Sequence, residues 1–81
     1  MPNEPKFRVE YLVPTYVDNA IEWDLYYTAF FTTRESLNTY LMSLQFVYYA
    51  RLSETLIEYI RYAITGALLA KVVVKEFKDE V

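Results

Sequence analysis

The chain has 81 residues, a net charge of −3 and a hydrophobic share of 54%, and it contains neither cysteine nor histidine. These absences exclude disulfides and Cys/His zinc sites, and they remove the thiol nucleophile and the usual general base. The acidic balance disfavours general nucleic-acid binding, because the chain as a whole repels phosphate. No apolar stretch is long enough for a membrane span, and the charged N-terminus does not resemble a signal peptide.

A short chain without covalent cross-links must obtain its stability from burial. Aromatic residues make up 19% of the chain, including nine tyrosines, and they supply the apolar area. We expect a single domain over residues 1–81, with loose tails at 1–6 and 78–81.

The first predicted element is a β-hairpin. Residues 7–13 alternate with the period of a strand, and Pro14, which has no backbone N–H, is expected to end it. Val17-Asp18-Asn19 is typical of a turn. The second strand is predicted to carry Trp23, Leu25, Tyr27, Ala29 and Phe31 on one face and Glu22, Asp24, Tyr26, Thr28 and Phe30 on the other.

A helix is predicted to begin at Thr32, because Thr32 and Glu35 have the spacing of a capping box. Its apolar stripe consists of Leu37, Tyr40, Leu41 and Leu44. Residues 45–52 favour a strand by propensity, although the helical stripe also continues through them and no glycine or proline ends the helix.

A second helix is predicted from Ser53, a good N-cap, to Gly66, which can end a helix in the left-handed conformation. A surface ion pair between Glu58 and Arg61 is expected on it. Residues 68–77 are predicted to form a final strand. The expected fold is α+β: a three- or four-stranded sheet in the order β-β-α-(β)-α-β, with two helices packed on one face.

Catalytic signals are weak. Glu10, Glu22 and Asp24 are acidic side chains of the hairpin that could serve acid–base chemistry or hold a hard cation, but charge on an outward strand face is the ordinary interpretation. A phosphate-binding loop is impossible with one glycine. We therefore expect no enzyme and no catalytic, cofactor-binding or metal-binding residue. The lysines at 71, 75 and 78 are interpreted as a solubilising edge strand.

The aromatic surplus is the best pointer to function. The second strand presents aromatics on both faces, and a sheet covered on one side buries only one of these sets. Exposed aromatics usually mark interaction surfaces. We predict a non-enzymatic structural or protein-interaction protein, a homodimer, with its interaction residues at Tyr26, Phe30, Tyr48 and Tyr49.

Nucleic-acid binding is the alternative function. Aromatics interleaved with arginines can stack bases. The residues are Tyr48, Tyr49, Arg51, Tyr59, Arg61 and Tyr62. The chain has no basic stripe that could follow a phosphate backbone, so this alternative is the weaker one.

The whole-chain composition, rich in Tyr, Ile, Leu and Val, with little glycine and no Cys or His, resembles that of small proteins from viruses of hyperthermophilic archaea, such as the turreted icosahedral viruses of Sulfolobus. The resemblance implies a small protein of the host cytoplasm or the virion, with a role in assembly or host interaction. It rests on composition alone and assigns no functional residue.

Overall fold

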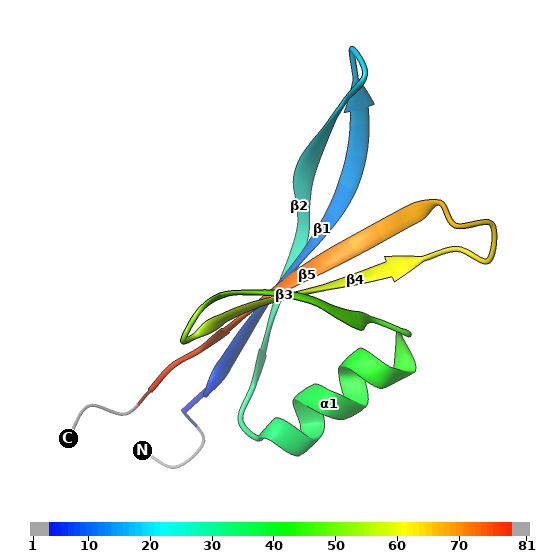
Figure 1. The fold of residues 1–81 in the computed structure, drawn as a ribbon. Coiled ribbons are helices and arrows are strands. Elements are labelled where there is room, and N and C mark those ends of the chain that lie inside the picture. The colour runs from blue at the N-terminus through cyan, green and yellow to red at the C-terminus, as the bar shows by residue number, and fades with distance from the viewer. Residues whose placement is uncertain (1–3, 79–81) are drawn as a thin grey trace.

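Residues 4–78 form one five-stranded antiparallel sheet and one helix, which lies in the sequence between the second and third strands (Figure 1). The structure is a computed structural model that describes residues 4–78. The elements are β1 (Phe7–Val17), β2 (Ala20–Phe31), α1 (Arg34–Ser43), β3 (Val47–Ser53), β4 (Leu56–Tyr62) and β5 (Leu68–Glu76). The strand order is β2-β1-β5-β4-β3, so β2 and β3 are the two edges.

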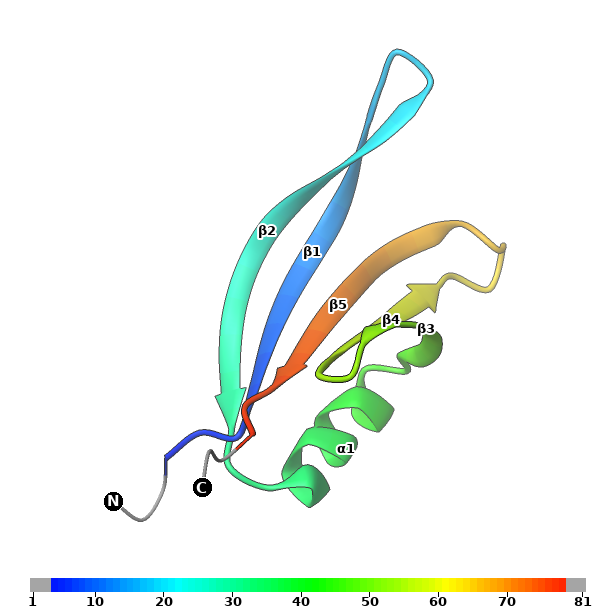
Figure 2. The ribbon, with the colours of Figure 1, turned by 60° about the vertical axis from the view of Figure 1, so that its left-hand side comes forward.

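The predicted hairpin is confirmed, with a longer first strand than expected. Asp18 and Asn19 both have positive φ, 51° and 67°, as a two-residue type I′ loop requires. β1 continues through Pro14 to Val17, so the expected end at Pro14 is wrong. Pairing between β1 and β5 ends at Leu12, and beyond it Pro14 has a neighbouring strand on one side only, where proline is tolerated. We call this two-stranded extension, residues 13–24, the hairpin arm (Figure 2).

A β-bulge in β2 changes which side chains share a face. Tyr11 pairs with Tyr27 but Leu12 pairs with Leu25, so Tyr26 is an extra residue. Because side chains alternate with a period of two, one extra residue reverses the faces of everything beyond it. The prediction that Trp23 and Leu25 share a face with Tyr27 is therefore wrong.

Helix α1 packs on one face of the sheet and ends without glycine. Its N-cap is Thr33, whose hydroxyl accepts a 3.1 Å hydrogen bond from the Ser36 backbone N–H, one residue later than predicted. At the other end, the N–H groups of Gln45 and Phe46 donate to the carbonyls of Met42 and Leu41. This is a Schellman motif, with Gln45 at φ 64° in the place glycine usually takes. It stops the helix and directs the chain into β3, which confirms the strand prediction for 45–52.

The predicted second helix does not exist in residues 4–78. Residues 56–62 form β4, which pairs with both β3 and β5. The α+β fold with two helices is therefore wrong, and the described chain is mostly β. The apolar residues of this segment fit a helical spacing, but its β-branched and aromatic side chains pack better in a central strand.

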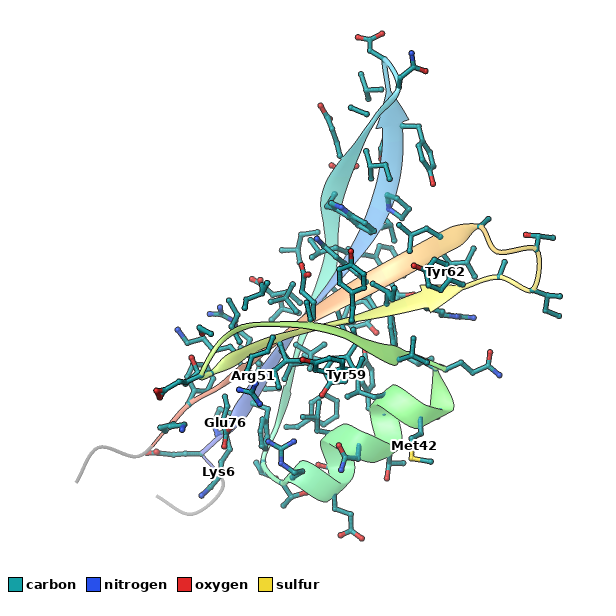
Figure 3. All side chains as sticks on the ribbon, in the orientation of Figure 1. Lys6, Met42, Arg51, Tyr59, Tyr62 and Glu76 are labelled. Atoms are coloured by element: carbon teal, nitrogen blue, oxygen red, sulfur yellow. The ribbon has the colours of Figure 1, made fainter. Side chains whose placement is uncertain are left out.

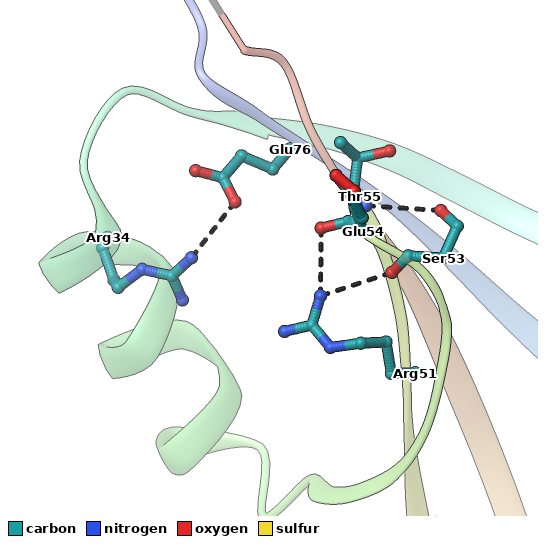
Figure 4. A network of polar contacts seen from close by, with 6 residues as sticks. All are labelled: Arg34, Arg51, Ser53, Glu54, Thr55 and Glu76. Carbon is teal, nitrogen blue, oxygen red and sulfur yellow. Dashed lines mark hydrogen bonds and ion pairs between the residues drawn. The ribbon is translucent and has the colours of Figure 1, made fainter.

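The signals that predicted the ends of that helix serve two turns. The Ser53 hydroxyl accepts from the Thr55 N–H, and the Arg51 guanidinium donates to the carbonyls of Ser53 and Glu54, closing the β3–β4 turn (Figure 4). Gly66, at φ 92°, lies in the β4–β5 turn, where its N–H donates to the Ala63 carbonyl. Local turn chemistry is common to helix caps and hairpins, so it does not distinguish them.

Within the predicted N-terminal tail, Lys6 is hydrogen-bonded to neighbouring backbone and is not loose. The Lys6 N–H donates to the Phe31 carbonyl and the Lys6 carbonyl accepts from the Phe77 N–H, which ties the chain ends to the sheet. Residues 1–3 and 79–81 of these tails lie outside the described residues.

The core lies between α1 and the sheet face below it. Its buried members are Phe7, Val9, Leu37, Leu41, Phe46, Ala70, Val72 and Val74. Tyr11, Phe31 and Tyr40 pack around them. The Tyr11 ring also stacks on the Tyr27 ring with the ring centroids 4.8 Å apart, and the centroids of the Phe31 and Tyr40 rings are 5.0 Å apart. The hydroxyls of Tyr27 and Tyr40 form a hydrogen bond with each other across the interface between the sheet and the helix. Aromatic bodies thus fill the core while their polar ends satisfy one another.

We expect Leu37→Ala to destabilise the fold by about 2–5 kcal/mol, because Leu37 is 1% exposed and its loss leaves a cavity under α1. Met42, on the same helix and 77% exposed, is the control: Met42→Ala should stay within about 0.5 kcal/mol (Figure 3). Urea denaturation measures both. Equal losses for the two variants would contradict this packing of α1.

Stability should also fall at alkaline pH through Tyr40. Burial, followed by the hydrogen bond to Tyr27, raises the pKa of Tyr40 well above the ordinary tyrosine value. The pKa of Tyr40 is higher in the folded chain than in the unfolded chain. The free energy of unfolding is therefore unaffected by titration of this group below about pH 10 and decreases progressively above it. Denaturation across that range should show a smaller alkaline loss for Tyr40→Phe than for the wild type. Identical pH profiles would exclude the effect.

Candidate interaction surface

The sheet face opposite α1 has no covering layer in residues 4–78 (Figures 1 and 2). We call it the open face. In β5 it carries Lys71, Val73 and Lys75, which alternate with the core residues of the same strand. β5 lies between β1 and β4 in the strand order, so the interpretation of its lysines as part of an edge strand is wrong. The cross-strand neighbours of these residues are Arg8, Glu10, Leu12, Leu56, Glu58 and Ile60.

A pocket of about 250 Å³ lies on the open face between the hairpin arm and the β4–β5 ladder. We call it the fork pocket, because it forms where β1 and β5 stop pairing after Leu12 and Lys71. It is lined by Ile21, Trp23, Tyr49, Glu58, Ile60, Tyr62, Leu68 and Lys71. Three aromatic and three aliphatic side chains thus surround one acid and one base; Tyr62 is labelled near the end of β4 in Figure 3.

The acid and the base are a shielded ion pair. Lys71 Nζ is 3.1 Å from Glu58 Oε2, and the two side chains are only 19% and 14% exposed. The same ammonium lies 4.5 Å from the centre of the Trp23 ring, a cation–π contact that connects the hairpin arm to the central strands. Because charges removed from water need partners, this arrangement satisfies Lys71 from two sides. The predicted Glu58–Arg61 pair is replaced by a pairing between strands.

Other cations in the described chain also have partners. At the start of α1, a guanidinium nitrogen of Arg34 lies 3.6 Å from a carboxylate oxygen of Glu76 in an exposed ion pair (Figure 4). The same guanidinium lies over the Phe7 ring. Arg51 is held by the two carbonyls of the β3–β4 turn. These cations support local structure and do not line up as a stripe.

The four predicted interaction residues are all exposed but are not brought together. Tyr26 and Phe30 belong to β2, and Tyr48 and Tyr49 to β3, at opposite edges of the sheet. Tyr26 packs against Tyr11 and Tyr27, toward the core side. Tyr48 makes an edge contact with Tyr59, whereas Tyr49 lines the fork pocket.

The central residues of the fork pocket were missed by sequence reasoning. The sequence pattern predicts Trp23 on the same face as Tyr27, Glu58 on a helix and Lys71 on an edge strand. The β-branched and aromatic residues of 56–62 and 70–75 are compatible with strands, but only the register between the two strands places Glu58 and Lys71 on the same face. Nothing in the sequence indicated the bulge that brings Trp23 to them.

The acidic side chains of the hairpin do not form a site. Thr15 donates a 2.6 Å hydrogen bond to Asp24, on the exposed arm. Glu10 lies before the bulge, opposite Val73 on the open face, so it does not share a face with Asp24. Among the described residues, no three acidic side chains lie close enough together to hold a metal ion.

Comparison with known proteins yields no match to a family model, a curated protein or a solved structure. The compositional resemblance to archaeal viral proteins therefore stays a prediction. None of the helices in the described residues has the length and apolar character needed to cross a membrane.

The Lys71–Glu58 pair should couple more strongly than an exposed pair. A double-mutant cycle with Lys71→Met and Glu58→Gln, measured by urea denaturation, should give a coupling of about 1 kcal/mol, because neither side chain is well solvated. The matched cycle of Arg34→Met with Glu76→Gln, an exposed pair, should give less than about 0.5 kcal/mol. The opposite ranking would contradict the shielding of the fork-pocket pair.

Proposed function

We propose that this chain is a non-enzymatic interaction protein that self-associates through the outer edge of β2. The observation that carries the proposal is the segment Leu25–Phe31, which we call the edge segment. It contains no charged residue, proline or glycine, and it belongs to an edge strand. Such an edge offers unpaired backbone groups and apolar side chains together, which favours pairing with another strand.

The opposite edge differs in the features that discourage pairing. β3 carries Arg51 near its end, and its register with β4 shifts at two places, whereas β2 has a single shift, at Tyr26 near one end of the edge segment. Irregular, charged edges resist addition of a further strand. The hairpin arm is likewise unsuited, since Glu22 and Asp24 alternate along its β2 side. The contrast directs self-association to residues 25–31.

A second copy of the chain is the partner that fits this edge. Two antiparallel edge segments can pair about a two-fold axis, so that each copy supplies the same residues. In such a dimer the exposed side chains of Leu25, Tyr26 and Phe30 would pack against their counterparts, and the two sheets would become one.

Nucleic-acid binding has less support. The net charge of the chain is −3, and Arg34, Arg51 and Lys71 have partners within the described part of the chain. A phosphate backbone would have to compete with those partners.

Sedimentation equilibrium at micromolar concentration tests the proposal. The wild type should be a dimer, and Phe30→Asp should be a monomer, because each copy would bury an unpaired carboxylate where the two edges meet. Val47→Asp is the matched control: Val47 is an apolar residue of the other edge strand and is 54% exposed, compared with 56% for Phe30. It should leave the dimer intact.

A monomeric wild type would exclude self-association. Dissociation by Val47→Asp but not by Phe30→Asp would instead move the interface to β3.

A further inference from the structure

We infer that the fork pocket is a binding site for a small, uncharged aromatic molecule bearing a hydroxyl group. This inference is separate from self-association, because no residue of the edge segment lines the pocket. It rests on the walls of the pocket, on its size, and on the charged pair within it.

The walls favour a planar apolar body. Trp23, Tyr49 and Tyr62 present aromatic surfaces, and Ile60 contributes an aliphatic one. Tyr49 and Tyr62 are exposed in the free chain and would lose that exposure to a ligand. Pockets of this composition, with a few convergent polar groups, are typical of small-molecule sites.

The volume limits the ligand to one or two rings. The pocket measures about 250 Å³. An engineered cavity of about 150 Å³ in another protein already admits benzene. A single ring with one substituent therefore fits, whereas most drug-sized molecules occupy larger sites.

The charged pair selects for a neutral ligand with a hydroxyl. Lys71 and Glu58 neutralise each other, so the pair gives no net attraction for a charged ligand. The Glu58 carboxylate repels an anion, and the Lys71 ammonium repels a cation. The ammonium has three N–H donors, and Glu58 accepts one of them. A hydroxyl can accept from Lys71 and also donate to a carboxylate oxygen of Glu58. An aromatic ring bearing such a group, a phenol, matches the walls and the polar pair at once.

Titration of the full chain with 4-methylphenol, followed by ¹H–¹⁵N NMR, tests the inference. Trp23 is the single tryptophan, so its indole N–H gives one resonance inside the site. We expect a saturable shift of that resonance and of the Ile60 and Lys71 amides, with Leu37 and Leu41 in the core unaffected. Toluene, which lacks the hydroxyl, should bind on the order of tenfold more weakly. Benzoate and benzylamine should not saturate the site.

Two variants identify the polar group responsible. Lys71→Met keeps an apolar stem of similar length and should reduce 4-methylphenol affinity to that of toluene. Lys75→Met is the matched control on the same strand and face, outside the pocket, and should bind like the wild type. The dispersion of the remaining amide resonances reports whether each variant is folded. If Lys71→Met does not fold, Tyr62→Ala, at the exposed wall of the pocket, should weaken the binding of both 4-methylphenol and toluene.

The inference is overturned if 4-methylphenol gives no saturable shift, if toluene binds equally well, or if a folded Lys71→Met variant retains wild-type affinity. Phe30→Asp separates this result from the proposed function. That variant should bind 4-methylphenol with unchanged affinity whether or not the wild type dimerises.

Discussion

The extra residue at Tyr26 divides the aromatic side chains of β2 between the two faces of the sheet, and the rest of the structure depends on this division. On the N-terminal side of Tyr26, Trp23 and Leu25 face away from the helix. On its C-terminal side, Tyr27, Ala29 and Phe31 face the helix side of the sheet. Without the bulge, Trp23 would point to the side of α1, away from Lys71. The bulge also adds local twist, as bulges generally do.

One ten-residue helix cannot cover both faces of a five-stranded sheet. α1 closes the core over Val9 and Val72, and the open face is left with a mixture of apolar residues and charges. The Lys71–Glu58 pair shows how this face remains stable: the charges are partly shielded, and each has the other as its partner. The same pair divides the apolar surface and makes the fork pocket chemically selective. Most exposed aromatics of the described residues lie in the fork pocket, on the two edge strands or on the hairpin arm.

Sequence reasoning identified the elements whose signals are local. The Asp18-Asn19 turn, the start of α1 within one residue and the valine-rich β5 each depend on a few neighbouring residues. It failed for residues 56–62, where Leu56, Ile57 and Ile60 satisfy both a helical and a strand pattern. The strand is stabilised by its two flanking strands, and each residue of β4 has a cross-strand partner in β5. Of the four predicted interaction residues, only Tyr49 lines the fork pocket.

The sequence by itself determined which chemistries are unavailable, since no fold can supply the missing histidine and cysteine, and it determined the Asp18-Asn19 turn and the large share of apolar residues. Only the tertiary structure decided where that load lies. Turn and cap preferences act over a few residues, whereas the faces of a sheet are set by register between strands far apart in the chain. The pairing of Leu12 with Lys71, and of Lys71 with Ile60, joins residues from three separate strands. That register, together with the extra residue at Tyr26, places Trp23 over Lys71 and opens the fork pocket beside them.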